Sequence, residues 1–492
     1  MNLLTLLDLT VAGHGDRVLL GTDRAGLTGL DLQRRARAGA AHVLAADART
    51  LVYLGENGLA FPIALFAAAT AGIPFLPLNY RLSADQLAEV VAAQEKPYVI
   101  SADPSIAGVS VEDWLSSTEG PGPDVALPPE PNPDAEAVLL LTSGTTAAPK
   151  SAVLRHRHLA AYVLDTVEFG GAAPTDAVVV SVPPYHIAAV ANLLSNLYTG
   201  RRIVYLDRFT PDGWLRTVAE QGVTHAMVVP TMLSRIVDAL EAGDAPAPRT
   251  LRSLSYGGAP LAPSILQRAL ALLPDVGFVN AYGLTETSSS VAVLGPEDHR
   301  TAAASDDPAV RARLGSVGRP LPSVEISIRD ASGAPAPAGQ IGAIFVRGPQ
   351  VAGEYRQGGS RVDPDGWFPT RDEGYLDAEG YLFVKGRADD TIIRGGENIA
   401  PAEIEDTIHQ LPGVAEAVVV GIPDTEWGQR IGAFVIRRPG ADLSEDGVRE
   451  YVRSVLRSSK TPDVVTFVEE LPRTPTGKIL RRDLVAAITP AQ

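Results

Sequence analysis

Short apolar runs alternate with longer amphipathic segments along most of the chain. Several of these runs are rich in Val and Ile, and they predict strands at 98–100, 137–141, 178–182, 202–205, 225–229 and 277–280. Between the runs, apolar residues recur three and four positions apart, as at Leu266, Leu270 and Leu273. This spacing is typical of helices that bury one face. Because strands that alternate with helices form parallel sheets covered on both faces, we expect an α/β fold.

The pattern changes twice in the second half of the chain. Residues 316–347 hold two apolar runs joined by the turn-rich link SGAPAPAGQ, which predicts a small antiparallel β unit. Beyond Arg387, the pattern predicts a helix at 400–411, strands at 414–422 and 432–438, and an amphipathic helix at 443–457. We therefore predict a large N-terminal domain of parallel αβ sheets plus the small β unit, residues 1–388, and a smaller α+β C-terminal domain, residues 389–492.

One stretch, residues 59–78, is almost wholly apolar and long enough to span a membrane. Three prolines and Gly72 interrupt it, so we expect a buried helix, a turn and a strand instead. No lysine or arginine precedes Arg17, whereas a signal peptide begins with basic residues. These features predict a cytoplasmic protein without a membrane span.

Composition narrows the function classes further. The 492-residue chain contains no cysteine, which excludes disulfides, thiolate metal sites and a cysteine nucleophile. With 58 acidic and 42 basic residues its net charge is −16, and no basic block is present, so nucleic acid and anionic lipid are not expected partners. The HExxH, GxSxG and GxGxxG signatures of metalloproteases, α/β-hydrolases and dinucleotide-binding dehydrogenases are absent as well.

A hydroxyl-rich segment follows one predicted strand, in the sequence LLLTSGTTAAPKS at 139–151. Hydroxyls and free backbone N–H groups around a glycine can surround phosphate oxygens, and a lysine adds positive charge. The candidate phosphate-binding residues are Thr142, Ser143, Gly144, Thr145, Thr146 and Lys150. A Walker A loop would need glycine at Pro149, so that interpretation fails. Taken alone, the segment is more typical of a Thr/Ser-rich surface turn.

The segment has three companions, and together the four resemble the adenylate-forming superfamily. They are TSGTTxxPK, NAYGLTET at 280–287, GWFPTRDEGYLDAEGYLFVKGRADDTIIRGGENIAPAEIE at 366–405, and LPRTPTGKILRRDL at 471–484. This superfamily includes acyl- and aryl-CoA ligases, nonribosomal adenylation domains and luciferases. The resemblance covers the chain almost end to end. It implies an N-terminal adenylation domain that binds ATP and an acid, and a mobile C-terminal domain.

The resemblance assigns the reacting groups. Lys478 matches the lysine that bridges substrate carboxylate and phosphate oxygens, and Thr285 matches a residue that hydrogen-bonds the α-phosphate. Glu286 corresponds to the glutamate that binds magnesium, and one carboxylate plus nucleotide phosphates is a normal way to hold this cation. His186 stands where the family has a gate between the acid pocket and the thiol tunnel. A histidine after a strand is otherwise more often structural.

The resemblance also implies a nucleotide site. Tyr282 should stack on adenine, Asp372 should accept hydrogen bonds from the ribose hydroxyls, and Arg387 should contact ribose or phosphate. Asn280 and the backbone of Gly257, Gly258 and Ala259 should line the base. Two departures from the family pattern stand out: Arg371 replaces the usual glycine before the aspartate, and Ala147 with Ala148 replaces a common glycine in the phosphate loop. The first of these puts the local turn in question.

The implied second half-reaction uses a different face of the C-terminal domain. Asp389 aligns with the hinge residue about which that domain swings. Gly395 and Gly396 offer a surface without side chains along which a pantetheine arm can run. The expected walls of the acid pocket are Tyr185, Ala188, Ala189, Asn192, Ser255, Gly257, Gly283 and Ser288. They suit an aryl or medium-sized acyl group, and none of them is charged.

The leading hypothesis is an ATP-dependent carboxylic acid–CoA ligase that forms an acyl-AMP intermediate, with ATP, Mg²⁺ and coenzyme A as cofactors and co-substrates. The alternative is a stand-alone adenylating enzyme that passes the acyl-adenylate to a carrier protein or a non-thiol nucleophile. A binding protein that holds nucleotide without turnover would need a broken motif, yet Lys478, Glu286 and Asp372 are all present. The sequence leaves open the acid, the pathway and the oligomeric state, monomer or homodimer.

Overall fold

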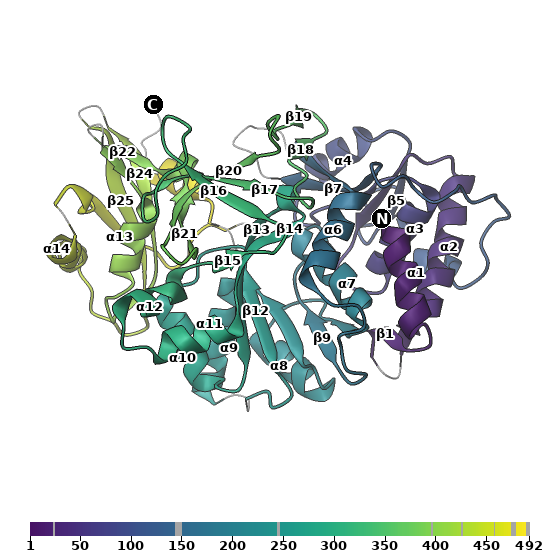
Figure 1. Ribbon diagram of the computed structural model, residues 1–492, viewed down its shortest axis with the longest axis horizontal. Coiled ribbons are helices and arrows are strands. Elements are labelled where there is room, and N and C mark those ends of the chain that lie inside the picture. Colours follow the sequence, from purple (N-terminus) through teal and green to yellow (C-terminus); the bar gives the residue numbers. More distant parts are fainter. Residues whose placement is uncertain are drawn as a thin grey trace.

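The computed structural model describes residues 1–22, 25–142, 150–243, 247–394, 397–424, 427–456, 458–473 and 479–488. Figure 1 shows a large body made by the N-terminal and middle parts of the chain, and beside it a smaller body made by the C-terminal part, in yellow-green. Four sheets organise the described residues.

The first sheet has eight strands in the order β19-β18-β8-β7-β4-β3-β5-β6. The run from β7 to β6 is parallel, whereas β8, β18 and β19 pair antiparallel. Its strands are β3 (Thr50–Leu54), β4 (Phe75–Pro77), β5 (Pro97–Ser101), β6 (Val109–Ser110), β7 (Glu136–Thr142), β8 (Lys150–Arg155), β18 (Glu354–Tyr355) and β19 (Gly359–Ser360). Its helices are α1 (Leu3–His14), α2 (Gly29–Ala45), α3 (Ala60–Ala71), α4 (Ala84–Ala92), α5 (Val111–Ser117) and α6 (His156–Thr166).

Alternate side chains of β3 show how this sheet is covered on both faces. Leu51 and Tyr53 pack in the same apolar cluster as Phe61 of α3. Val52 and Leu54 belong to a second cluster with Leu87 of α4. Because successive strand residues point to opposite faces, α3 and α4 lie on opposite sides of the sheet.

The second sheet has nine strands in the order β15-β14-β13-β12-β11-β9-β10-β1-β2. It is parallel from β13 to β1, and antiparallel strands flank it at both edges. Its strands are β1 (Val18–Gly21), β2 (Gly26–Thr28), β9 (Ala177–Val180), β10 (Arg202–Tyr205), β11 (His225–Val228), β12 (Ser253–Gly257), β13 (Gly277–Leu284), β14 (Ser289–Leu294) and β15 (Arg319–Pro320). The associated helices are α7 (Ile187–Thr199), α8 (Pro211–Glu220), α9 (Pro230–Ala242), α10 (Pro263–Leu272), α11 (Pro296–Ala304) and α12 (Pro308–Ala312), with the 3₁₀ turns η1 (Thr285–Thr287) and η2 (Arg313–Gly315).

Helix boundaries in this region follow from particular residues. Helices α8, α9 and α10 each have proline at their first position. A backbone N–H at this position would have no partner within the helix, so proline, which lacks this group, is tolerated there. Helix α7 ends at Gly200, whose φ of +78° lies in the left-handed region that glycine adopts without a steric penalty. These residues therefore determine where α8, α9 and α10 begin and where α7 ends.

The third sheet is small and antiparallel. It contains β16 (Glu325–Arg329), β17 (Gly342–Arg347), β20 (Phe368–Leu376) and β21 (Leu382–Arg387), paired in that order. The antiparallel unit predicted at 316–347 accounts for its first two strands, and the sheet continues to residue 387.

The C-terminal part forms a separate α+β unit. It begins after the turn η3 (Ala388–Asp390), into which the predicted boundary between residues 388 and 389 falls. Its elements are β22 (Ile392–Arg394), β23 (Glu397–Ile399), α13 (Pro401–Ile408), β24 (Val414–Asp424), β25 (Gly428–Arg437), α14 (Glu445–Val455), η4 (Ser458–Lys460), β26 (Val464–Phe467) and α15 (Arg481–Ile488). The buried side chains of Ile404 and Ile408 join α13 to its own apolar core.

The apolar stretch 59–78 forms helix α3, a turn at Gly72 and strand β4, as predicted. In the described ranges, no helix combines the length and the apolar character that crossing a bilayer requires. The α/β class with a smaller α+β C-terminal unit is confirmed, with the refinement that antiparallel strands edge both large sheets.

Candidate active site

A cavity opens where the parallel strands of the nine-stranded sheet end. Its volume for the centre of a water-sized sphere is about 50 Å³, and about 590 Å³ of empty space, part of it open solvent, surrounds these positions. The lining residues are Val182, Pro183, His186, Ile187, Ala188, Met227, Val229, Met232, Gly257, Gly258, Ala281, Gly283, Ser289 and Ser290. In open α/β sheets, ligands bind outside the carboxyl ends of the strands, and this cavity lies at that edge.

Two glycines allow the strands beside the cavity to approach one another closely. A Cβ atom on Gly257 would lie 2.2 Å from the carbonyl oxygen of Ala281, and one on Gly283 would lie 2.0 Å from that of Ser289. Neither distance is possible without moving the backbone. Strands β12, β13 and β14 therefore approach closely only because these positions are glycine.

The structure places some of the expected pocket residues on this cavity and others away from it. Ala188, Gly257 and Gly283 line the cavity, with the predicted gate residue His186 and the predicted adenine-loop residue Gly258 beside them. The cavity lining does not include Tyr185, Ala189, Asn192, Ser255 or Ser288.

Their local contacts explain where these side chains go. Ser255 Oγ donates to the carbonyl oxygen of Ala226 at 3.2 Å, and Asn192 Oδ1 accepts from Asn196 at 2.7 Å. Ser288 has φ of +56° and is fully buried, and the next two serines line the cavity in its place. Sequence reasoning missed Met227, Val229 and Met232. Met227 and Val229 stand at the carboxyl end of β11, and Met232 lies in the first turn of the helix that follows. The end of a predicted strand was the available signal.

His186 caps helix α7 and is neutral at pH 7. Its Nδ1 accepts a hydrogen bond from the backbone N–H of Ala188 at 3.1 Å, so the ring proton sits on Nε2. Burial lowers the pKa of the His186 imidazole to about 4. A capping and a gating role are therefore compatible, because the cap uses only Nδ1.

Tyr282, Asp372 and Arg387 lie together at the meeting point of the nine-stranded and four-stranded sheets. The Tyr282 hydroxyl donates to Asp372 Oδ2 at 2.6 Å, and Arg387 Nε lies 3.6 Å from Asp372 Oδ1. Asp372 on β20 and Arg387 on β21 are paired in register. Burial, and then the charge of Asp372, raise the pKa of Tyr282 well above its usual value. The structure thus brings together three residues predicted for the nucleotide site.

Arg371 resolves the question raised by the missing glycine. Its φ is +64°, in the left-handed region that glycine favours. The turn before Asp372 therefore keeps the backbone conformation expected of glycine, at a cost of about 1 kcal/mol for a residue with a Cβ. The Arg371 guanidinium lies 3.8 Å from the carboxylate of Asp389, the predicted hinge residue, which is exposed in η3.

Glu286 is held by a segment distant in sequence. Its backbone carbonyl accepts hydrogen bonds from the N–H groups of Ala352 at 2.9 Å and Gly353 at 3.0 Å. Its carboxylate oxygen Oε1 accepts from the hydroxyl of Tyr355. Burial, followed by the charge of Glu286, raises the pKa of Tyr355. The carboxylate of Glu286 is therefore fixed from both its backbone and its side chain.

The same segment supports the rest of the η1 turn. The fully buried side chain of Gln350 donates to the carbonyl oxygens of Thr287 at 2.9 Å and Ser290 at 2.7 Å. These contacts hold the turn that carries Thr285 and Glu286. Sequence reasoning missed Gln350 and Tyr355, because nothing in their local sequence indicates a contact with a turn 63 to 69 residues earlier.

Several predicted residues fall outside the described ranges. They are Ser143, Gly144, Thr145 and Thr146 in the phosphate loop, Gly395 and Gly396, and Lys478. Thr142 ends β7 and Lys150 begins β8, and the two are paired in register. The predicted adenine residue Asn280 uses its Nδ2 to donate to Ser316 at 3.0 Å, and Ala259 directly follows Gly258, whose φ is +84°.

Comparison with known proteins identifies the family. The AMP-binding enzyme model matches residues 7–356, and the model of the AMP-binding enzyme C-terminal domain matches residues 403–478. The first match alone covers more than half of the chain. The chain therefore belongs to the AMP-binding enzyme family.

Individual relatives are similar over most of their length. The fatty acid–[acyl-carrier-protein] ligase ScoC of Streptomyces coeruleorubidus is 32% identical over 460 residues, 88% of this chain and 86% of the relative. Feruloyl-CoA synthase of an Amycolatopsis species is 32% identical over 482 residues, 93% of each chain. The solved o-succinylbenzoate CoA synthetase (MenE) of Bacillus subtilis, in complex with its acyl-adenylate intermediate, has a TM-score of 0.84 and 26% identity, with 97% of each chain covered. The same enzyme is known in complex with ATP and a magnesium ion.

These similarities confirm the predicted adenylate-forming superfamily and the predicted class of acid–thiol ligases. The roles of the individual residues stay predictions.

Proposed function

We propose that this protein is an ATP-dependent carboxylic acid–CoA ligase that forms an acyl-AMP intermediate on an aryl or medium-sized acid. The observation that carries the proposal is the position of the cavity. Its lining residues Gly283 and Ser289 stand on either side of the turn with Thr285 and Glu286. An acid whose tail fills the cavity would therefore present its carboxylate beside the proposed phosphate and magnesium groups.

The first half-reaction joins two anions. A carboxylate oxygen of the acid attacks the α-phosphorus of ATP, and the bond from that phosphorus to the bridging oxygen of pyrophosphate breaks. Positive groups must neutralise and align the reactants as charge develops. Lys478, Lys150 and the hydroxyl of Thr285 are proposed for this work.

Glu286 is proposed to hold Mg²⁺ together with nucleotide phosphates. Among the described residues, no group of three or more His, Asp or Glu side chains is placed to bind a metal ion, so a site completed by phosphates fits the donor set. The cation would withdraw charge from the phosphate oxygens when bound. Tyr355 occupies Oε1 of Glu286 and thereby fixes the direction of the carboxylate.

Asp372 and Tyr282 are proposed to bind the nucleoside. A carboxylate can accept hydrogen bonds from both ribose hydroxyls, and Asp372 is nearly fully buried, so each such bond is protected from water. Arg387 balances the charge of this carboxylate and is proposed to contact ribose or phosphate. Asn280 and the backbone of residues 257–259 are proposed to line the base.

The second half-reaction transfers the acyl group to a thiol. The sulfur of CoA attacks the acyl carbon, and the bond between that carbon and the AMP oxygen breaks. We propose that the C-terminal domain rotates about Asp389 so that Gly395 and Gly396 face the thiol arm. The neutral His186 lies on the cavity wall, where it is proposed to separate the acid from the thiol path.

The experiment that tests this function is a panel of carboxylic acids assayed for pyrophosphate release with ATP and Mg²⁺, with and without CoA. Acid-dependent release that CoA accelerates, with a thioester as product, is the expected result. Absence of release with every acid would contradict the proposal. The similarity to ScoC favours a carrier protein as the second candidate acceptor. A phosphopantetheinylated carrier protein in place of CoA discriminates between the two acceptors.

We also propose a cytoplasmic location. The chain contains no cysteine, so a reducing compartment would break no disulfide in this chain. Fractionation of cells that express the tagged protein measures the location directly.

A further inference from the structure

The far wall of the acid cavity is formed by methionine. The chain contains three methionines, and the two besides Met1 both line the cavity. Met227 belongs to β11, and Met232 lies in the first turn of α9, which follows that strand. Their placement on one cavity is a feature to be explained, because methionine is rare elsewhere in this chain.

The sheet order places this wall away from the reacting groups. Glu286 and Thr285 follow β13, and β12 separates β13 from β11. Met227 pairs with Ser255, and Ser255 pairs with Val279 of β13. Neighbouring strands lie about 4.8 Å apart, so Met227 is about 10 Å across the sheet from Val279, and the turn with Glu286 begins beyond the end of β13. A carboxylate held beside Glu286 would therefore direct the tail of its acid toward the two methionines.

The described part of the cavity lining is uncharged at neutral pH. Of the described residues that line the cavity, none is Lys, Arg, Asp or Glu. The one titratable group is His186, which is neutral at pH 7 because burial lowers its pKa to about 4. A second anionic group on the acid would lose its hydration here without finding a positive partner.

The methionines determine which neutral tails fit. Methionine is unbranched and polarizable, fills irregular gaps and makes favourable contacts with aromatic ring edges. Met232 Sδ lies 3.8 Å from Ser181 Oγ, its hydrogen-bond donor, and Met227 packs against the apolar core that includes Ile187. Both partners are uncharged, so the wall is apolar and adaptable in shape.

We infer that this enzyme selects monocarboxylic acids with an uncharged apolar or aryl tail, and that Met227 and Met232 are the specificity-determining residues that contact this tail. The inference rests on the proposed ligase function. It sets the chain apart from its structural relative that acts on o-succinylbenzoate, an acid with a second carboxylate.

Matched acid pairs test the selectivity. Hexanoate and hexanedioate have carbon chains of the same length, and 4-methylcinnamate and 4-carboxycinnamate have similar shapes. The members of each pair differ in one anionic group. We expect kcat/KM for pyrophosphate release to be about 10²–10³-fold lower for the diacid of each pair, because its second carboxylate must be buried unpaired. Equal values for the two members would overturn the inference.

Substitutions in the wall test the residues. Met232→Arg supplies the missing cation and should raise kcat/KM for the diacids while lowering it for the neutral acids by at least about tenfold. Met232→Leu keeps an apolar wall and should retain the preference for neutral acids. Met227→Ala should shift the optimum toward longer tails by removing bulk. An acid profile that is the same in all these variants as in the parent protein would exclude the two methionines from specificity.

Binding measurements separate this inference from the proposed function. Calorimetric titration of the unmodified protein with each acid, in the presence of AMP, reports tail recognition without turnover. Tighter binding of the neutral acid together with no pyrophosphate release would support the inference and contradict the ligase function. Pyrophosphate release with equal use of neutral and dianionic acids would support the ligase function and overturn the inference.

Discussion

Tyr355 and Glu286 are distant in sequence and form a hydrogen-bonded pair only in the folded chain. The tyrosine hydroxyl donates to the carboxylate, and the strand that carries Tyr355 is itself anchored by the bidentate ion pair of Arg155 with Glu354, at 2.8 and 2.9 Å. A bidentate pair fixes orientation as well as distance. The carboxylate proposed for magnesium is therefore aimed by a rigid neighbour.

The first prediction concerns this pair. Tyr355→Phe should weaken binding of Mg²⁺·ATP by about tenfold, because groups that orient a ligand contribute about that much to metal affinity. Glu286→Gln should weaken it further, since a neutral amide is a poorer ligand for a hard cation. Calorimetric titration and the magnesium dependence of pyrophosphate release measure both effects. Tyr451→Phe is the matched control, because that hydroxyl donates to Gln410 at the surface. Unchanged magnesium dependence in both active-site variants would place the ion elsewhere.

The second prediction separates the half-reactions at a single residue. Lys478→Ala should slow acyl-adenylate formation by about 10²–10³-fold, by analogy with loss of one electrostatic donor in a transition state. Thioester formation from a supplied acyl-adenylate should be largely retained. Arg482→Ala, which removes an 87% exposed side chain four positions later in the sequence, serves as the control. Equal losses in both half-reactions would contradict the role assigned to Lys478.

At this scale, the sequence predicted residues that lie within contiguous motifs and missed those brought in by folding. Asp372 and Arg387 were recognised from their motif, and strand pairing places them together. Tyr355, Gln350 and Met232 reach the site from other elements. Their neighbours in sequence carry no information about those contacts, which arise from packing between distant segments.

Among the elements, the short turn η3 joins the two bodies. Ion pairs hold it from both sides: Arg371 with Asp389 at 3.8 Å, and Arg481 of α15 with Asp390 at 3.5 Å. Both pairs involve partly exposed side chains, and such pairs contribute only about 0–1 kcal/mol each. Neither ion pair therefore adds much to the stability of the turn, and its role as a hinge stays a prediction.

The third prediction tests this turn as a hinge. Asp389→Pro fixes φ near −65°, so the chain can satisfy only one of two domain poses. If that angle suits the adenylating pose, ATP–pyrophosphate exchange should survive while thioester formation falls. The two rates are measured on one folded preparation together with its melting temperature.

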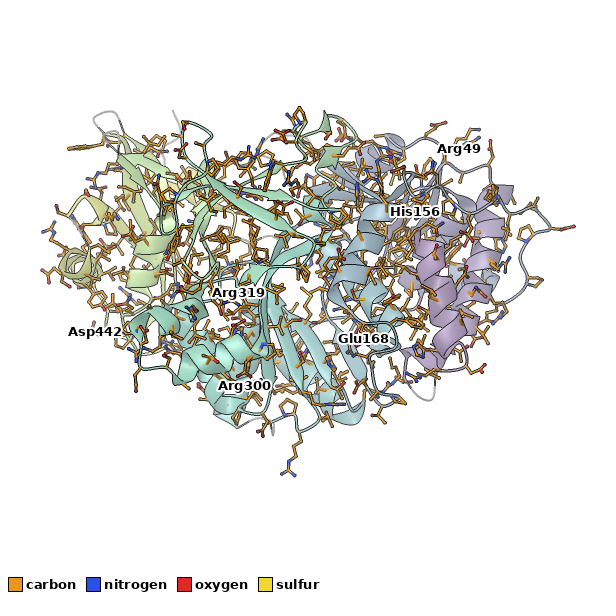
Figure 2. The ribbon with its side chains drawn as sticks, in the orientation of Figure 1. Arg49, His156, Glu168, Arg300, Arg319 and Asp442 are labelled. Carbon is orange, nitrogen blue, oxygen red and sulfur yellow. The ribbon has the colours of Figure 1, made fainter. Side chains whose placement is uncertain are left out.

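The control places proline at Asp442, an exposed loop position before α14 that Figure 2 shows at the edge of the molecule. Asp442→Pro should leave the ratio of the two rates unchanged. A parallel loss of both rates in Asp389→Pro, with a lower melting temperature, would indicate a purely structural role. Full thioester synthesis would exclude the hinge.

The sequence predicted most helices and strands because their periodicity is local. The 59–78 stretch shows this, since its prolines and Gly72 divide it as the structure does. Strand order could not be predicted in the same way. The pairing of Tyr355 with Ala152 joins segments about two hundred residues apart, and no local pattern specifies it.

Buried histidines make the stability of the whole molecule depend on pH. Burial lowers the pKa of His156, His186 and His225 to about 4 and that of His158 to about 3. Figure 2 shows His156 on α6 toward α1, where its Nδ1 accepts from the backbone N–H of Leu3 at 3.4 Å. Protonation of these rings would place unpaired charge in both large sheets and their helices.

The fourth prediction follows from these pKa values. Between about pH 4 and the usual histidine pKa of 6.5, the unfolded chain binds more protons than the folded one, so stability falls as the pH is lowered through this window. Each histidine should contribute about 1–2 kcal/mol to the loss at pH 5. Urea unfolding at pH 5, 6 and 7.5 measures the slope. His158→Gln should reduce that slope, and an identical slope in the variant would contradict the assignment.

The two methionines of the acid cavity also determine how the protein responds to oxidants. With no cysteine in the chain, every sulfur atom other than that of Met1 stands on the cavity wall. Mild peroxide would oxidise the exposed Met1 and the two cavity thioethers, and only the latter two products place a polar sulfoxide where the proposed apolar tail would lie. Oxidative stress would then change what the enzyme accepts before it unfolds the protein, and a sulfoxide reductase would restore the original preference.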